Sequence, residues 1–339
     1  MHAQIRENIS LRELNTFGIQ AVARHFASFD SVEALEQILA DSHPEKRLLI
    51  LGGGSNVLLT KDFEGLVLKN EIEGINLISE DEEHVYMRAG SGLNWHQFVL
   101  YCLHNNYAGV ENLALIPGSV GASPIQNIGA YGVEVKDVFH QLEAYNIRQK
   151  KTETFSFADC GFGYRESIFK HQYKGQYVIT GVTYRLNKTP VLNTSYGALR
   201  SELERMEVKD VSIKEVAQAV INIRMSKLPD WKVLGNAGSF FKNPQIHNDQ
   251  FNELQKSFPS IVAFAAGPNC TKLAAGWLIE QCGWKGYRDG DAGCYEKQAL
   301  VLVNYGSATG NDINNLSERI ISSVAEKFSV WLEREVNII

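Results

Sequence analysis

The sequence predicts an α+β fold with a mixed N-terminal half and a separate C-terminal unit. Strand-like apolar runs recur through the first half between amphipathic helical patterns, and a proline-containing stretch at 227–230 precedes a unit of different composition. The 339 residues are enough for about two or three domains. Apolar residues make up 44% and charged residues 21%, and this composition excludes a disordered or fibrous protein.

Apolar periodicity predicts the elements of the N-terminal half. Ser31 opens an amphipathic helix whose apolar face contains Val32, Leu35, Ile38 and Leu39. A second helix is expected over 94–104. Strands are predicted at 48–51, 65–69, 85–88, 142–147 and 177–186.

The C-terminal half begins with a capped helix and a hinge. Ser212-x-x-Glu215 is a capping box that opens a helix with one apolar stripe, and Lys227-Leu-Pro-Asp230 ends it. Beyond the hinge we expect a helix near 271–281, a strand at 299–303, a long helix from Asn311 and a terminal strand at 330–336.

Charge and cysteine content narrow the function classes. Lys and Arg number 33 against 39 Asp and Glu, so the formal charge of −6 argues against a nucleic-acid binder, although a local pocket for a small anion stays possible. No apolar run approaches the ~18 residues that a membrane span needs, and residues 1–11 lack the apolar core of an export signal. The five cysteines form no CxxC pair, which indicates free thiols in a cytoplasmic protein. The nine histidines form no HExxH or HxH cluster, so no metal site is expected.

A first glycine-rich loop follows the predicted strand at 48–51. It reads Gly52-Gly53-Gly54-Ser55-Asn56, and its unencumbered backbone can approach a phosphate closely. The spacing matches neither the Rossmann nor the Walker pattern. A tight turn without a ligand is an equal alternative for this motif alone.

A second loop, residues 116–132, carries more information. It is poor in charge and interleaves glycine, serine and amide side chains with apolar anchors, so it could wrap a large flat ligand with backbone donors. An ordered loop without a ligand is the alternative. The two loops together favour a dinucleotide held by backbone amides, with contributions in this loop from Pro117, Gly118, Gly121, Ser123, Asn127 and Gly129.

Three further residues stand in motifs that are ambiguous one by one. Arg165, in Phe-Gly-Tyr-Arg-Glu-Ser, could be an ordinary surface salt-bridge partner. Ser239, in Gly-Ser-Phe-Phe-Lys-Asn-Pro, could cap a turn or line a site. Glu333 and Glu335 share one face of the predicted last strand and are by default solvated charges. Reasoning from the residues alone thus reaches an enzyme of a cofactor and a small anion, without its reaction.

Taken together, these segments resemble the family of UDP-N-acetylenolpyruvoylglucosamine reductases (UDP-N-acetylmuramate dehydrogenases), type I branch. The matching segments are NTFG from Asn15, LGGGSN, IPGSVGASPIQNIGAYG, FGYRESIFK, KLPD, NAGSFFKNP, KLAAGWLIEQCG and WLEREV. They span residues 15 to 336 in the family's order, so the resemblance covers nearly the whole chain.

The resemblance implies an FAD-binding unit of the vanillyl-alcohol-oxidase-like (PCMH) type with a C-terminal α+β substrate domain. It implies FAD-binding subdomains at 1–70 and 71–225, the second with the Tyr196 loop, then a substrate domain at 226–328 and a terminal strand at 329–339 that returns to the active site. FAD would be bound, and NADPH would reduce it and leave before UDP-N-acetylglucosamine enolpyruvate enters. The implied setting is cytoplasmic peptidoglycan precursor synthesis, and hence cell-wall biogenesis, cell shape and division, without an obligate protein partner or membrane insertion.

The resemblance also assigns roles to single residues. Hydride from the flavin adds to the enolpyruvyl methylene, Arg165 stabilises the charge that develops on the carboxylate, and a protonated Glu335 assists. Ser239 gives a proton to the α-carbon, with Lys227 or Lys242 as its helper. The residues that match substrate contacts are Tyr196, Lys227, Asn243 and Lys285, the last of them suited to the diphosphate.

One departure and two alternatives remain. The family's terminal motif usually reads Pro-Glu-Val-Arg, whereas this chain has Arg334-Glu335-Val336-Asn337, so contacts of the missing Arg are in question. One alternative is another FAD oxidoreductase of the same fold, such as an oxidase. The other is a nucleotide-sugar binding protein without redox chemistry, against which Arg165, Ser239 and Glu335 speak.

Overall fold

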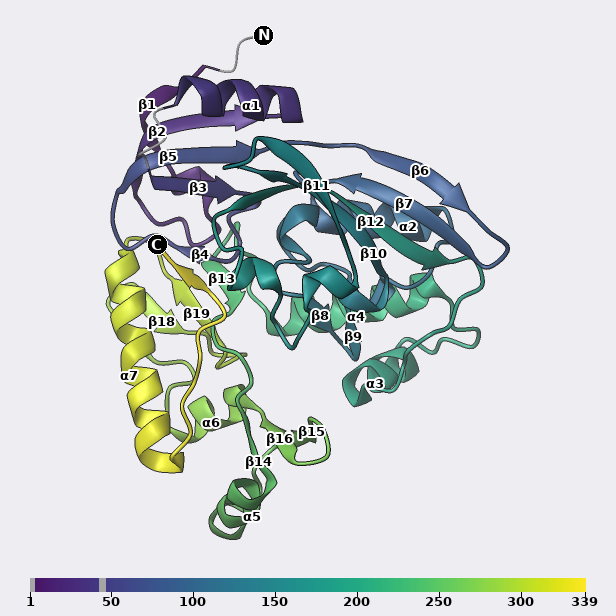
Figure 1. Ribbon diagram of the computed structural model, residues 1–339. Coiled ribbons are helices and arrows are strands. Elements are labelled where there is room, and N and C mark those ends of the chain that lie inside the picture. The colour runs from purple at the N-terminus through teal and green to yellow at the C-terminus, as the bar shows by residue number, and fades with distance from the viewer. Residues whose placement is uncertain (1–3, 43–46) are drawn as a thin grey trace. The chain divides into compact units, whose positions relative to one another are not determined.

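The computed structural model describes residues 4–42 and 47–339 and divides into two compact units (Figure 1). Unit 1 contains Ala23–Gly53 and Glu64–Ser226 together with the chain up to Ile9. Unit 2 contains Ser10–Val22, Gly54–Phe63 and Lys227–Ile339. Residues 1–3, which belong to the segment searched for an export signal, and residues 43–46 lie outside the described part.

The first sheet of unit 1 has four strands with a helix packed on it. Its order is β1 (Arg6–Ser10), β2 (Val22–Phe29), β5 (Phe63–Asn70) and β3 (Arg47–Leu51). Helix α1 (Val32–Asp41) lies along this sheet, and its N-cap Ser31 accepts a hydrogen bond from the Ala34 N–H, as the sequence predicts (Figure 1). Leu35 and Ile38 of α1 are fully buried in the core of the sheet.

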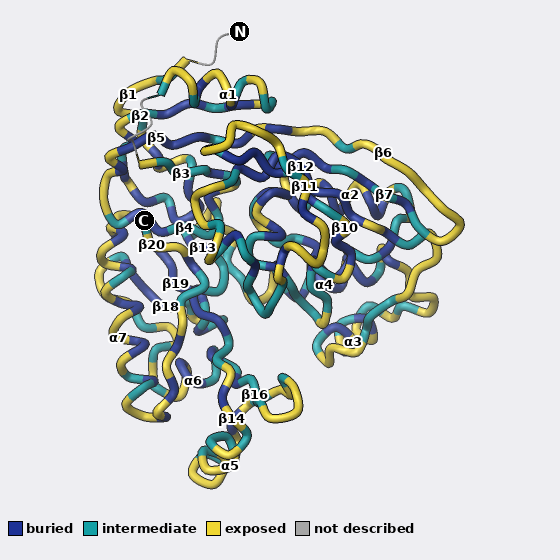
Figure 2. The backbone as a smooth tube through the Cα atoms, in the orientation of Figure 1, coloured by how far each residue is buried: buried dark blue, intermediate teal, exposed yellow. Residues whose placement is uncertain are grey.

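A five-stranded antiparallel sheet forms the rest of the unit 1 framework. Its order is β11 (Lys151–Ser156), β10 (Phe139–Asn146), β12 (Tyr177–Asn187), β7 (His84–Gly90) and β6 (Ile75–Glu80). Helices α2 (Trp95–His104) and α4 (Ile213–Lys227) share one buried cluster with this sheet. Strand β12 is buried along nearly its whole length, whereas Figure 2 shows the edge strand β6 exposed along most of its length.

Short elements connect these parts of unit 1. They are β8 (Gly129–Ala130), β9 (Val133–Glu134), α3 (Gly197–Arg205) and single 3₁₀ turns at Glu111–Leu113, Val120–Ala122, Val135–Asp137, Ala158–Cys160 and Ile168–Lys170. The loop at 116–132, predicted to lack regular periodicity, contains only such short turns and strands.

Unit 2 is built on another four-stranded antiparallel sheet. Its order is β13 (Gly235–Ser239), β19 (Val301–Asn304), β18 (Ala292–Cys294) and β17 (Arg288–Asp289). The long helix α7 (Gly310–Phe328) opens with a capping box formed by Thr309 and Asp312 and buries one apolar stripe. The remaining elements are the 3₁₀ turn Arg12–Leu14, β4 (Val57–Leu58), β14 (Gln245–His247), α5 (Asn248–Ser257), β15 (Ala263–Ala265), β16 (Cys270–Leu273), α6 (Ala275–Gln281) and β20 (Asn337–Ile338).

Two predicted elements of the C-terminal half are wrong in their bounds. The helix expected near 271–281 begins only at Ala275, because Cys270–Leu273 pairs with β14 on one side and β15 on the other. The strand expected at 330–336 is an extended segment with a single bridge, Phe241 to Arg334. Its alternation reflects burial on one side only, with Val330 and Leu332 buried and Trp331 74% exposed.

No helix in residues 4–42 and 47–339 is long and apolar enough to cross a membrane. Within the same residues, no three His, Cys, Asp or Glu side chains gather so that they could hold a metal ion. All five cysteines lie in the described part of the chain and are free thiols.

Candidate active site

The two glycine-rich loops meet in unit 1. A Cβ on Gly53 would lie 2.9 Å from the Gly118 Cα, and a Cβ on Gly52 would lie 2.3 Å from the Ser119 Oγ. Side chains are therefore excluded where these backbones pack. The Lys69 ammonium, at the end of β5, donates a hydrogen bond to the Gly52 carbonyl, and burial lowers the pKa of Lys69. A cation thus accompanies the first loop, although neither loop sequence contains one.

Lys69 is a residue that sequence reasoning missed. Its position follows from the parallel pairing of β3 with β5, in which Leu51, the last residue before the first glycine, is the partner of Lys69. A search for cations at the end of the strand paired with β3 would have found it.

The start of the second loop is tied to the residues around the beginning of α2. The Trp95 N–H donates to the Gly118 carbonyl at 3.0 Å, and the Gly121 N–H donates to the Ser91 carbonyl at 2.9 Å. A Cβ on Gly121 would lie 2.6 Å from the Ser91 Cβ, so this glycine allows close packing. Pro117, immediately before these contacts, is exposed.

Two predicted cofactor residues point their side chains into the protein. The Ser123 hydroxyl lies 2.8 Å from the Tyr184 hydroxyl in the core. The Asn127 amide donates to the Gly163 carbonyl at 2.9 Å, and its oxygen accepts from the Lys136 N–H at 3.1 Å. Any contact of these two residues with a cofactor would therefore come from their backbone.

Arg165 is directed at the second loop. Its Nη2 donates to the Gly129 carbonyl at 2.6 Å, and its guanidinium carbon lies 5.3 Å from the centre of the Tyr164 ring. The backbone of Arg165 has φ +57°, a left-handed conformation that is unfavourable for a long side chain. The structure thus brings together Arg165 and Gly129, which the sequence placed in separate motifs.

A second cation, Arg224, lies beside Arg165 and was not predicted. It stands in the last turn of α4, and burial lowers its pKa, with the charge of Arg165 adding to this effect and Tyr131 opposing it. Tyr131 in turn packs edge-to-face on Tyr196, with ring centres 5.4 Å apart. Arg224 follows the buried Val220 by four residues and so lies on the apolar stripe of the helix. A charged residue at such a position is the sequence feature that could have indicated this site.

In unit 2, Ser239 stands at a bulge in β13. The pairing of β13 with β19 is interrupted between Asn236 and Ser239, and Gly238 has φ +68°. The Asn236 side-chain oxygen accepts from the Gly238 N–H at 3.0 Å and so fixes this turn. A bulge re-aims the side chain that follows it, and within the described residues the Ser239 hydroxyl has no hydrogen-bond partner.

Glu335 lies beside the residue that follows Ser239. The Glu335 N–H donates to the Phe240 carbonyl at 2.9 Å, so the terminal segment runs antiparallel to the chain after β13. The Asn56 side-chain amide donates to the Glu335 carbonyl at 3.2 Å, and the Asn337 side chain donates to the Asn56 carbonyl at 3.0 Å. The structure thus gathers Ser239, Glu335 and Asn56, and Asn337 contacts Asn56 at the position where the family usually has Arg.

The rest of the first loop belongs to unit 2. Gly54 has φ +63°, and a Cβ there would lie 2.0 Å from the Leu14 carbonyl oxygen, so only glycine fits this turn. Ser55 beside it is half-buried.

Lys242 forms an ion pair that the sequence did not predict. Its side chain is 6% exposed, and its Nζ lies 2.5 Å from a carboxylate oxygen of Glu333, whose side chain is 70% exposed. Glu333 is therefore exposed, as expected, but it is the counter-ion of a buried ammonium. This pair and the hydrogen bond from the Lys242 N–H to the Glu333 carbonyl, at 2.9 Å, bind the terminal segment two residues before Glu335.

The remaining predicted substrate residues lie on separate elements of unit 2. Lys227 is exposed at the end of α4. The Asn243 oxygen accepts from the Ala275 N–H at the start of α6, at 2.9 Å. Lys285 pairs with Glu280 at 2.9 Å on the surface.

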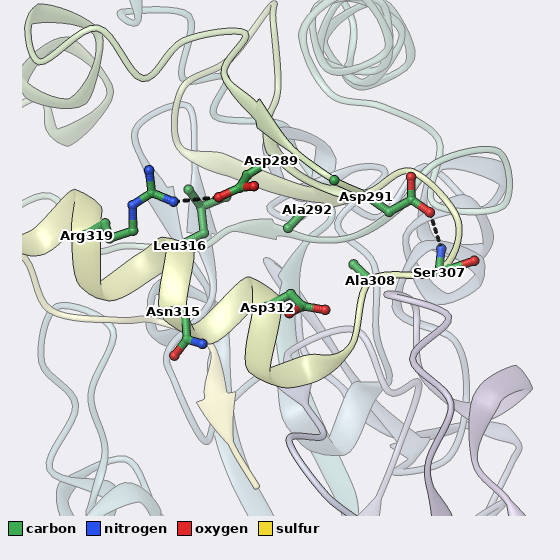
Figure 3. A pocket seen from close by; sticks show the side chains of 10 residues that line it. Asp289, Asp291, Ala292, Ser307, Ala308, Asp312, Asn315, Leu316 and Arg319 are labelled. Carbon is green, nitrogen blue, oxygen red and sulfur yellow. Dashed lines mark hydrogen bonds and ion pairs between the residues drawn. The ribbon is translucent and has the colours of Figure 1, made fainter.

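Unit 2 also contains a hollow of about 590 Å³ beside α7 (Figure 3). Two of its carboxylates are bonded to other lining residues, with Arg319 2.7 Å from Asp289 and the Ser307 N–H donating to Asp291 at 2.8 Å. None of the predicted site residues lines it. The hollow is therefore not the candidate site.

Known proteins resemble this chain along nearly its whole length. Residues 23–150 match an FAD binding domain, and residues 229–339 match the C-terminal domain of UDP-N-acetylenolpyruvoylglucosamine reductase. The chain is 49% identical over 337 residues to the UDP-N-acetylenolpyruvoylglucosamine reductase of Flavobacterium johnsoniae, covering 99% of this chain and 100% of that protein. It is 50% identical over 336 residues to that of Amoebophilus asiaticus, covering 99% of each.

A solved structure shares the fold. The crystal structure of the UDP-N-acetylenolpyruvylglucosamine reductase of Thermus caldophilus superposes with a TM-score of 0.70 at 23% identity and covers 99% of both chains. Together with the domain matches, this likeness confirms the predicted fold class, an FAD-binding unit followed by a C-terminal α+β domain.

Proposed function

Because the chain belongs to the UDP-N-acetylenolpyruvoylglucosamine reductase family, we propose that it reduces UDP-N-acetylglucosamine enolpyruvate to UDP-N-acetylmuramate, with NADPH as the electron donor. The chain is an FAD-dependent oxidoreductase of peptidoglycan synthesis. The observation that supports the proposal is the hydrogen bond from the Glu335 N–H to the Phe240 carbonyl, which brings the backbone of the terminal segment to the residue that follows Ser239. We place the reaction in the cytoplasm, where free thiols such as those of this chain persist.

The residues of the glycine loops fit FAD. Gly53 packs against Gly118, and neither residue has a side chain that would cover the backbone N–H groups. Lys69 adds positive charge next to Gly52. The loops therefore suit the diphosphate of a dinucleotide. We assign the holding of FAD to these loops, together with Asn56 and Gly129. When bound, FAD supplies the hydride that reduces the enolpyruvyl methylene.

Arg165 stabilises the negative charge that develops on the substrate carboxylate as the methylene is reduced. A single fixed donor of this kind is worth about 3–4 kcal/mol in the transition state. Arg224 beside it raises the local positive potential, and this favours an anionic group at the same place. Tyr196, which packs on Tyr131, is assigned to cover the substrate.

Ser239 delivers the proton to the α-carbon. The bulge at Gly238 directs its hydroxyl, and Glu335 in its protonated form donates a hydrogen bond to the developing charge. Lys242 is paired with Glu333. We therefore assign to Lys227 the role of assisting Ser239. Asn243 and Lys285 are assigned to the nucleotide sugar, with Lys285 at the diphosphate.

The Ser239→Ala variant tests this function in two half-reactions. Without oxygen, NADPH should bleach the yellow flavin of the variant at nearly the wild-type rate, because the serine acts only later. Return of the colour on adding UDP-N-acetylglucosamine enolpyruvate should slow by about 10²–10⁴, the usual contribution of a positioned acid. Ser257→Ala, at an exposed serine at the end of α5, is the matched control and should change neither rate.

Three outcomes would contradict the proposal. Equal loss of rate in both half-reactions would contradict the assignment of the protonation step to Ser239. A protein that never takes up FAD would contradict the proposed function altogether. Rapid reoxidation by oxygen, with no response to the nucleotide sugar, would indicate an oxidase of the same fold.

A further inference from the structure

Leu115 has a backbone conformation that leucine disfavours, immediately before the loop at 116–132. Its φ is +59°, in the left-handed region that glycine adopts readily and that brings the Cβ of other residues too close to the backbone. Such strain persists only when the surrounding structure over-determines the conformation. What holds Leu115 is therefore informative about the loop that it begins.

Two side chains, one from each of two helices, form hydrogen bonds with the backbone of Leu115. The Leu115 N–H donates to Nδ1 of His96 at 3.0 Å, and the Leu115 carbonyl accepts from Nε of Arg224 at 3.2 Å. His96 stands in the first turn of α2 and Arg224 in the last turn of α4, and both helices pack into the same core. Both polar groups of the residue are thus fixed by rigid elements.

The protonation state of His96 fits this role. Only a ring nitrogen without a proton can accept the Leu115 N–H. Burial lowers the pKa of His96, and the charge of Arg224 lowers it further, so the neutral form is favoured.

We propose that His96 and Arg224 are positioning residues for FAD, because they hold Leu115 in its left-handed conformation and so set the direction in which the loop at 116–132 leaves. Gly118, three residues later, is the residue whose backbone packs against Gly53. A rotation at Leu115 would displace this contact and the backbone donors beyond it. The inference rests on the proposed binding of FAD by these loops.

The test measures the dissociation constant of FAD and its rate of release from the holoenzyme, by flavin fluorescence. His96→Ala should raise the dissociation constant by at least about tenfold, the scale of one strained backbone residue. His96→Asn, whose side-chain oxygen can accept the same N–H, should retain most of the affinity. His104→Ala is the matched control at an exposed histidine of the same helix and should have no effect.

A second substitution distinguishes backbone strain from lost packing. Leu115→Gly in the His96→Ala background removes the strain at positive φ and should restore FAD affinity to within about threefold of wild type. Leu115→Ala in the same background truncates the side chain but keeps a Cβ, so it should restore little.

Two results would overturn the proposal: unchanged FAD binding in His96→Ala, or equal recovery in the glycine and alanine double variants. If His96→Ala does not fold, the same glycine and alanine comparison in an Arg224→Gln background decides. A wild-type protein that never binds FAD is a different result and overturns the proposed function instead.

Discussion

Glu111 places a carboxyl group in the core of unit 1, where a negative charge is costly. It is 2% exposed, and its carboxylate accepts the Gly109 N–H at 2.6 Å. Burial raises the pKa of Glu111 above its usual range, although backbone hydrogen bonds oppose this effect. The folded state therefore binds the proton of this group more tightly than the unfolded chain does.

The raised pKa predicts how Glu111→Gln alters stability with pH. The glutamine keeps an acceptor for the Gly109 N–H but cannot ionise. The free energy of unfolding of the wild type should fall relative to the variant as the pH rises from about 4.5 through the folded pKa, because the folded state holds the proton of Glu111 more tightly. Denaturant unfolding at a series of pH values measures the difference.

Glu202 supplies a control of opposite sign. Its hydrogen bonds to Arg205 lower the pKa of Glu202, so its carboxylate stabilises the fold above the unfolded pKa and loses this effect as the pH falls. As the pH rises from the lowered pKa to about 4.5, the free energy of unfolding of Glu202→Gln should therefore fall relative to that of the wild type. The same pH dependence in both variants would contradict the assignment to Glu111.

The terminal segment that carries Glu335 depends on the Lys242–Glu333 pair. Glu333→Gln would remove one carboxylate that pairs with the buried Lys242 ammonium and should lower the free energy of unfolding by about 1–3 kcal/mol, reduced from the value for a fully buried pair because Glu333 is exposed. Reoxidation of the flavin by the enolpyruvyl substrate should slow, while bleaching by NADPH remains. Denaturant unfolding and the two half-reactions measure these effects.

A double variant separates the charge from the packing. Lys242→Met together with Glu333→Gln should be more stable than Glu333→Gln alone, because methionine occupies similar volume without a charge. Glu326→Gln, at an exposed residue of α7, is the control. A Glu333→Gln protein as stable as wild type would show that Lys242 does not need this partner.

The sequence could predict the elements whose patterns are local. The helix capped at Ser31 and the strands at 65–69 and 177–186 are present because apolar spacing and a capping side chain determine them. The bulge that presents Ser239 could not be predicted, since it depends on the register between β13 and β19. The resemblance named Arg165, Ser239 and Glu335, whereas Arg224 and His96 became visible only when two helices were placed around Leu115.

The division into two units depends on contacts that no local pattern records. Ser10–Val22 and Gly54–Phe63 belong to unit 2 although most of that unit comes from the other end of the chain. Hydrogen bonds tie the first of these segments there, from Thr16 Oγ1 to the Asn236 carbonyl at 2.6 Å and from the Asn304 amide to the Phe17 carbonyl at 3.0 Å. Composition and periodicity describe neighbours along the chain, and these partners are more than 200 residues apart.

FAD should stabilise the whole protein by mass action, because only the folded chain brings the two glycine loops together. Removing FAD and restoring it to about 100 times its dissociation constant should raise the free energy of unfolding by about 2.7 kcal/mol. Gly53→Ala should lose this gain, because its Cβ would lie 2.9 Å from the Gly118 Cα, whereas Gly197→Ala, where a Cβ meets no atom within 4 Å, should keep it. Thermal unfolding with and without FAD measures both variants, and an equal FAD-dependent gain in Gly53→Ala and wild type would separate these loops from the cofactor.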